Sequence, residues 1–142
     1  MTDSLDVFLN GDHIGALQRT SSGNLSFEYL ETYRVRPQAT PLSCSMPLTA
    51  AHHSDRVVRP FVWGLLPENE RVLSRWAREF QVSPRNPLAL LRSVGSDLPG
   101  SVQMFEPGEV PSTLNGEIEW LDEVDVERLL QAVQRDQSEW IA

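Results

Sequence analysis

The 142-residue chain fits a single domain, and its 40% hydrophobic and 23% charged residues are ordinary for a globular protein. This composition excludes a disordered or fibrous chain, and no apolar run approaches the ~18 residues that a membrane-spanning helix needs. All 12 basic residues are arginine, so the chain lacks the lysine of a Schiff base, a P-loop or a kinase ATP site. One cysteine and an acidic start without a signal peptide predict a cytoplasmic protein without an internal disulfide.

The net charge of -8 is unevenly distributed along the chain. Residues 1–105 carry 10 acids and 10 arginines, whereas residues 106–142 carry 10 acids and 2 arginines. Because phosphate contacts need positive surface, this distribution argues against direct binding of nucleic acid. We therefore expect an α+β domain over 1–105, followed over 106–142 by an acidic loop and a C-terminal helix.

Short alternating apolar segments in the first half predict strands joined by tight turns. Asn10-Gly11 favours a two-residue hairpin turn, because both residues tolerate positive φ. The expected strands are 5–9, 14–17, 25–29, 42–46 and 101–105. The resulting fold class is α+β, with a small antiparallel sheet or partial barrel and about three helices packed on it.

The expected helices cover about 68–80, 87–94 and 123–135. In the first of these, Trp76 and Phe80 share one face with Val72 and Leu73, so we expect core positions under the sheet. The second has Asn86 as its cap, Pro87 at its first position and Gly95 at its end.

The third helix is capped by Asp122 and carries an apolar stripe. Leu121 can form a hydrophobic staple with the first residue of that stripe. The stripe consists of Val126, Leu129, Leu130 and Val133. Acids crowd the first turn, which the helix dipole favours, so a solvated polar face explains them better than an acidic interaction tail.

No catalytic or metal-binding set assembles from these residues. The loop 95–101 has phosphate-loop glycine spacing, but Ser101 occupies the lysine position, so a helix end and tight turn explain it better. His52 and His53 are expected to be exposed loop residues, and Cys44 a small buried side chain, rather than zinc ligands or a nucleophile. Glu68 and Glu70 fit dipole-favoured positions at a helix start.

Five segments in the same order resemble the N-terminal subdomain of the HipA-like serine/threonine kinase toxins of bacterial toxin–antitoxin systems. They are the hairpin 5–17, Gly-Asn-Leu-Ser-Phe-Glu-Tyr at 23–29, Pro-Leu-Ser-Cys-Ser-Met-Pro-Leu at 41–48, Trp-Gly-Leu-Leu-Pro-Glu-Asn-Glu at 63–70, and Val-Gly-Ser-Asp-Leu-Pro-Gly-Ser-Val-Gln at 94–103. Gly64 and Ser101 depart from the usual Asn and Ala of that family. Both changes are small.

The resemblance implies a larger protein than this sequence. Members of the family continue into a kinase body with the ATP-binding lysine, a phosphorylated serine loop, the catalytic Asp and the metal ligands, none of which occurs here. The resemblance therefore gives this chain no catalytic, cofactor-binding or metal residue, and ATP and Mg²⁺ are implied only for a kinase body. It also implies phosphorylation of a translation-related protein, growth arrest and inhibition by a DNA-binding antitoxin.

Two functions follow from the resemblance. The chain is either the non-catalytic N-terminal domain of such a kinase, in contact with the kinase body in cis, or a stand-alone small protein that restrains a separate kinase in trans. In both, a DNA-binding antitoxin is a further partner, and neither membrane nor nucleic acid is contacted directly.

The expected partner interface comprises Trp63, Leu65, Leu66, Trp140 and Ile141. A turn can bury only some of its apolar side chains, and the last two residues follow a helix whose core positions are already assigned. Large apolar groups left exposed are unfavourable by ~25 cal/mol per Å², and interfaces are enriched in Trp at their centres. The competing interpretation is that both segments close the core of a self-sufficient monomer.

Overall fold

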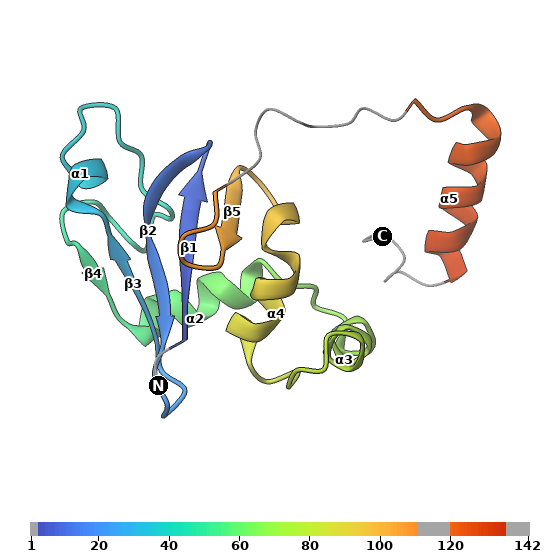
Figure 1. The fold of residues 1–142 in the computed structure, drawn as a ribbon, viewed down its shortest axis with the longest axis horizontal. Coiled ribbons are helices and arrows are strands. Elements are labelled where there is room, and N and C mark those ends of the chain that lie inside the picture. Colours follow the sequence, from blue (N-terminus) through green and yellow to red (C-terminus); the bar gives the residue numbers. More distant parts are fainter. Residues whose placement is uncertain (1–2, 111–119, 136–142) are drawn as a thin grey trace.

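The computed structural model describes residues 3–110 and 120–135 (Figure 1). Five antiparallel strands form one open sheet in the order β4-β3-β2-β1-β5. The strands are β1 (Asp3–Leu9), β2 (Asp12–Arg19), β3 (Leu25–Tyr29), β4 (His52–His53) and β5 (Val102–Phe105). The predicted α+β class is confirmed, with an open sheet in place of a partial barrel.

The hairpin between β1 and β2 forms where Asn10-Gly11 predicted it. Both residues have positive φ, 51° and 83°, which is the conformation that a two-residue turn of this kind requires. The Asn10 amide also donates to the Ser101 carbonyl at 3.0 Å. That bond ties the turn to the segment leading into β5, the strand on the other side of β1.

Six helical segments accompany the sheet in the described part of the chain. They are α1 (Glu31–Arg34), α2 (Asp55–Gly64), α3 (Glu70–Glu79), α4 (Pro87–Val94), the 3₁₀ turn η1 (Gly95–Asp97) and α5 (Glu123–Arg135). The three predicted helices are present, and Asn86 caps α4 through a bond from the Ala89 amide at 3.2 Å. The sequence did not reveal α2, because Pro60 in its interior is a helix-breaking signal.

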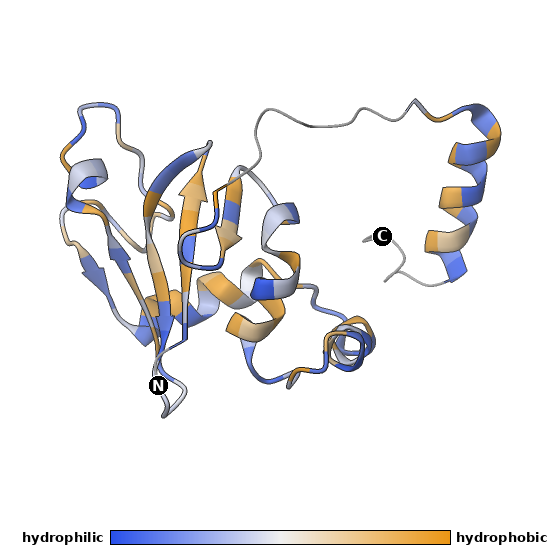
Figure 2. Ribbon diagram, viewed as in Figure 1, coloured by the Kyte–Doolittle hydropathy of each residue, from blue (hydrophilic) through white to orange (hydrophobic). Residues whose placement is uncertain are grey.

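One core lies between the sheet and helices α2 and α4. In Figure 2 the hydrophobic positions of β1, β2 and β5 and of these helices gather in the same part of the molecule. Trp76 from α3 is 5% exposed and belongs to this core, as predicted, while Phe80 is half-buried at its edge. The apolar side chains with no exposed surface are Leu5, Val7, Ile14, Met46, Val62, Leu88, Leu90 and Leu91.

The expected strand over 42–46 is wrong, because the buried Tyr29 holds this segment as turns, and the buried Tyr33 holds the residue Thr40 that leads into it. The Tyr29 hydroxyl donates to the Met46 carbonyl at 2.5 Å and accepts from the Leu42 amide at 2.8 Å. The Tyr33 hydroxyl likewise bonds both backbone groups of Thr40. The backbone groups that would form hydrogen bonds with a neighbouring strand are therefore bonded to tyrosine side chains. Burial raises the pKa of Tyr29, against the opposing effect of the Leu42 amide, which lowers it.

Two further expectations about this region are wrong. Cys44 is exposed, since the turn directs Met46 and, in part, Leu42 toward the core and leaves Cys44 on the outside. His53 is buried, at 8% exposure, and its Nε2 lies 3.1 Å from the Pro47 carbonyl and 3.0 Å from the Ala50 carbonyl. This imidazole closes the turn by local hydrogen bonding, so only His52 is exposed as expected, and both residues form strand β4 in place of the expected loop.

Helix α5 lies apart from the sheet (Figure 1). Its predicted cap is confirmed, since the Asp122 carboxylate accepts from the Asp125 amide at 2.8 Å. No residue of α5 is buried. Across the described ranges, no helix combines the length and apolar character needed to cross a bilayer.

Candidate interaction groove

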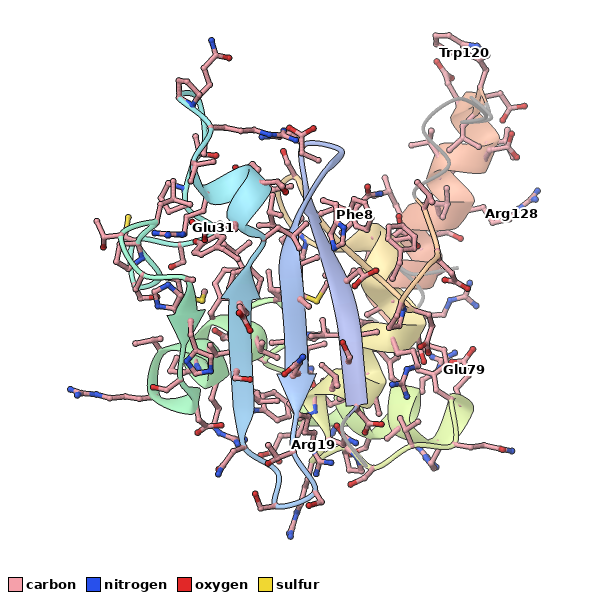
Figure 3. The ribbon with its side chains drawn as sticks, turned by 60° about the vertical axis from the view of Figure 1, so that its left-hand side comes forward. Phe8, Arg19, Glu31, Glu79, Trp120 and Arg128 are labelled. Atoms are coloured by element: carbon pink, nitrogen blue, oxygen red, sulfur yellow. The ribbon has the colours of Figure 1, made fainter. Side chains whose placement is uncertain are left out.

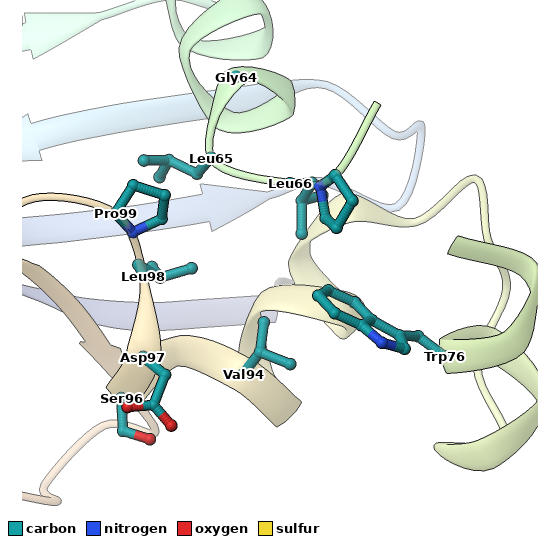
Figure 4. Close-up of a pocket in the computed structure, with 10 residues that line it drawn as sticks. Gly64, Leu65, Leu66, Trp76, Val94, Ser96, Asp97, Leu98 and Pro99 are labelled. Atoms are coloured by element: carbon teal, nitrogen blue, oxygen red, sulfur yellow. The ribbon is translucent and has the colours of Figure 1, made fainter. Parts of the chain in front are cut away.

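A groove with a volume of about 710 Å³ lies where four segments meet (Figure 4). We call it the α2–α4 groove. It is formed by the end of α2 and the following turn, by α3, by the last residue of α4, and by η1 with the residues after it. Its lining residues are Gly64, Leu65, Leu66, Pro67, Trp76, Val94, Ser96, Asp97, Leu98 and Pro99.

The floor of the groove is continuous with the hydrophobic core. Leu66, Trp76 and Val94 are each 4–5% exposed and belong to the core cluster. The rim is different, because Gly64 and Pro99 are exposed and Leu65 is half-buried. The groove is therefore a rigid apolar depression whose edges are accessible to another molecule.

The sequence explains why α2 stops at this groove. The amides of Leu65 and Leu66 donate to the carbonyls of Val62 and Trp63 in a last tight turn, at 3.1 and 3.2 Å. Pro67, which lacks an amide proton, then prevents the helix from continuing. Asn69 starts the next helix by accepting from the Arg71 amide at 2.9 Å.

The opposite wall depends on Gly95. A Cβ at this position would lie in contact with the backbone carbonyl of Met104 on β5, so only glycine allows the end of α4 to approach β5 this closely. The Gln103 side chain donates to the Ser96 carbonyl at 3.3 Å and links η1 to the same strand. These contacts hold the buried Leu98 and the exposed Pro99 on this wall of the groove.

The groove has an apolar lining and little polar chemistry. Ser96 and Asp97 are its polar side chains, and both are exposed on the rim. Within residues 3–110 and 120–135, no three His, Cys, Asp or Glu side chains gather as metal ligands would. This arrangement suits an apolar side chain or short apolar segment of a protein partner.

The five residues predicted from the sequence divide into three groups. Leu65 and Leu66 line the groove. Trp63 is half-buried against the core at the end of α2 and is not part of the lining. Trp140 and Ile141 lie outside the described residues.

Three lining residues were not predicted from the sequence to belong to this surface: Trp76, Leu98 and Pro99. Trp76 was expected only in the core, yet its ring forms part of the floor (Figure 4). The combination Leu98-Pro99 between a helix end and a strand was the available signal, because proline at such a position is exposed and fixed in conformation.

A charged contact on the far side of α2 anchors this helix to the sheet. The Asp55 carboxylate accepts from the Leu25 amide at 2.7 Å and pairs with Arg59 at 2.8 Å. Arg59 also donates to the Gly23 carbonyl at 2.7 Å. The Arg59 guanidinium and then the Leu25 amide hold the pKa of Asp55 below its usual value.

A second apolar surface is present on α5. Trp120, just before the helix, is 90% exposed, and Figure 3 shows its ring standing clear at one end of α5. The apolar stripe predicted for this helix is also accessible, with Leu129 44% and Leu130 58% exposed. The described part of the chain therefore has two apolar surfaces, one concave and one helical.

Three comparisons with known proteins relate this geometry to other chains. The model of the HipA N-terminal domain family matches residues 5–105. The protein named "Putative kinase Y4mE", from Sinorhizobium fredii, is 35% identical over 133 residues, which cover 91% of this chain and 31% of the relative. The chain thus spans about a third of the length of this rhizobial relative.

A solved structure shares the fold. It is a chain in the complex of HipA, HipB and operator DNA from a Shewanella oneidensis MR-1 toxin–antitoxin system. The TM-score is 0.71 at 23% identity, and the match covers 89% of this chain and 29% of that chain. At this identity the likeness shows the fold alone.

Proposed function

Because the chain belongs to the HipA N-terminal domain family, we propose that it is a non-catalytic binding domain for the kinase region of a HipA-like toxin. By kinase region we mean the remaining part of a protein such as the rhizobial relative, which this chain does not match. The domain packs against that region and contributes to the surface that an antitoxin contacts. It supplies no group to phosphoryl transfer.

The α2–α4 groove is the observation that carries this proposal. It is apolar, its floor is fixed by the core, and its rim is accessible. Interfaces are centred on such depressions, into which a partner inserts apolar anchors. Leu65 is the groove residue best placed to meet a partner, because it is half-buried on the rim.

A co-purification experiment tests the proposal. The kinase region of the rhizobial relative is co-expressed with this chain, and the recovered complex is quantified. We expect a stable complex with the unchanged chain and a loss of at least about tenfold with Leu65→Asp, because a carboxylate would be buried without a partner.

The matched control for this experiment is Val35→Asp. Val35 is 68% exposed at the end of α1, so the same change of chemistry is made away from the groove. The thermal midpoint of each variant alone shows that it is folded. Equal capture of the Leu65→Asp and Val35→Asp chains would contradict the role of the groove.

The non-catalytic role is tested by titrating the purified chain with Mg-ATP in a calorimeter. The nucleotide-binding lysine that kinases place on the phosphates does not occur in this sequence. We expect no heat of binding up to millimolar ATP. Micromolar, magnesium-dependent binding would contradict the proposal.

The same surface serves two arrangements. The kinase region can follow this domain in one polypeptide, or the domain can bind and restrain a kinase encoded separately. Sequencing the adjacent reading frame separates the two: an in-frame kinase region indicates the first, and an independent gene the second. By analogy with the solved complex, a DNA-binding antitoxin is a further partner of the assembled toxin.

A further inference from the structure

Helix α5 has the pattern of a packed helix, yet within residues 3–110 and 120–135 none of its side chains is buried. Its stripe recurs at positions 126, 129, 130 and 133, which share one face of a helix. Val126 and Leu129 are nevertheless 43% and 44% exposed. An isolated 13-residue helix is only marginally stable in water, so its stability normally comes from an apolar face packed on another element.

The comparisons indicate that this helix also occurs in a much longer protein. The family model ends at residue 105, but the match to the rhizobial relative covers 91% of this chain. Only 9% of the chain, about 13 residues, remains unmatched. Even if all of these residues lie at the end of the chain, the match still includes the first half of α5 (Glu123–Arg135). In that relative, about two-thirds of the protein is available to cover the stripe.

The dimensions of α5 argue against a second copy as its partner. At about 1.5 Å per residue, 13 residues give a helix of roughly 20 Å with four stripe residues on one face. Two such faces bury far less than the ~800 Å² per partner of a stable protein interface. A larger surface must contribute the remaining contacts.

The charges beside the stripe define the chemistry of that surface. Glu123, Asp125 and Glu127 crowd the first half of α5, whereas its cations are Arg128 and Arg135. Acids flanking an apolar stripe favour a groove with an apolar floor and basic residues on its rim. Such a groove can also accommodate the acidic first turn of α5, whose negative charges the helix dipole stabilises.

From these observations we infer that α5 is a docking helix, whose apolar stripe seats in a basic-rimmed apolar groove of the kinase region. This inference rests on the proposed function and adds a second contact to the α2–α4 groove. The domain then holds the kinase region at two places, joined by the segment between β5 and α5.

Two neighbouring substitutions test this inference. Leu130→Asp places a carboxylate on the stripe. Gln131→Asp introduces the same residue, with the same charge and helix propensity, on the opposite face of the helix. Each variant is first heated alone and examined by size-exclusion chromatography with light scattering. It is then co-expressed with the kinase region of the rhizobial relative, and the recovered complex is quantified.

We expect both variants alone to be monomers with the thermal midpoint of the unchanged chain. The complex should fall at least about tenfold for Leu130→Asp and remain for Gln131→Asp. A lower thermal midpoint for the Leu130→Asp chain alone would show that α5 packs on its own domain. That result would overturn the inference. A dimer of the unchanged chain that Leu130→Asp dissociates would show that a second copy covers the stripe, with the same consequence.

The experiment also separates this inference from the proposed function. A complex that survives both substitutions overturns the docking role of α5 and leaves the proposed function standing. No complex with the unchanged chain counts against both. Loss with Leu130→Asp and with Leu65→Asp, but with neither control, supports both contacts.

Discussion

Helices α3 and α5 have similar sequence patterns and opposite environments. Both begin with a side-chain cap, Asn69 in one and Asp122 in the other, and both carry an apolar face at helical spacing. In α3 that face meets the core, and Trp76 is 5% exposed. In α5 no residue is buried. Periodicity therefore predicts that a helix has an apolar face and does not show what covers it.

The largest effect is expected from a substitution in α3, the packed helix of this pair. Trp76→Ala should lower the free energy of unfolding by about 3–5 kcal/mol, because it empties a site in the core. Leu129→Ala should change it by less than about 0.5 kcal/mol, since Leu129 is 44% exposed and does not belong to the core cluster. Urea unfolding followed by tryptophan fluorescence and circular dichroism measures both. A similar loss for the two variants would show that α5 belongs to the same cooperative unit.

A smaller effect is expected where α4 approaches the sheet. Gly95→Ala should cost about 1–3 kcal/mol, because its Cβ would overlap the Met104 carbonyl and force the wall of the groove to move. Gly64→Ala is the control, since a Cβ there meets no atom within 4 Å and alanine is the better helix former. The thermal midpoints should move in opposite directions. An unchanged midpoint for Gly95→Ala would contradict the close approach.

The Asp55 carboxylate, which anchors α2 to the sheet, should make the free energy of unfolding depend on pH. The lowered pKa of Asp55 means that its stabilising contribution is complete above the ordinary value of 3.8 and is lost as the pH falls below it. Asp55→Asn removes the charge and should cost about 0.5–1 kcal/mol at neutral pH, since the pair is partly exposed.

The check is thermal unfolding of the two proteins at pH 7 and at a series of pH values falling below 3.8, the ordinary pKa of the group. The difference between their midpoints should narrow as the pH falls. Glu79→Gln, an equal loss of charge at an exposed helix end, should show no such difference at any pH in the series. A gap that persists in acid would contradict the role of the Asp55 charge.

The smallest effect concerns the cap of α5. Asp122→Ala should reduce the stability of this helix by about 1 kcal/mol, because the Asp125 amide loses its acceptor. The domain itself should unfold at an unchanged temperature, since α5 contributes nothing buried to it. Far-ultraviolet circular dichroism at 25 °C reports the first quantity, and the thermal midpoint the second. A lower midpoint would indicate that α5 supports the sheet.

Features that depend on neighbouring residues were readable from the sequence. Asn10-Gly11 specified a hairpin turn, and Asn86-Pro87 specified the start of α4. The strand expected over 42–46 failed for a different reason, because the Tyr29 hydroxyl bonds the backbone of Leu42 and Met46 from 13 and 17 residues away. Helix α2 was hidden by Pro60 and is held in place by a bond from the Leu25 amide to Asp55.

The candidate site was readable only in part. Leu65 and Leu66 stood out as apolar residues in a turn before a proline, and both line the α2–α4 groove. The opposite wall could not be predicted, because it depends on how closely Gly95 lets α4 approach β5. The interface role of all five residues stays a prediction: Trp63, Leu65, Leu66, Trp140 and Ile141.

Hydrogen exchange of the chain alone tests the central claim, that the stripe of α5 is left uncovered by its own domain. Amides of α3 and α4 should exchange slowly, with protection close to the global free energy of unfolding. Amides of α5 should exchange within seconds, as expected for a short helix that has no buried residue in the described part of the chain. Protection of α5 equal to that of α3 would contradict the claim, since it would show that the domain already covers this helix.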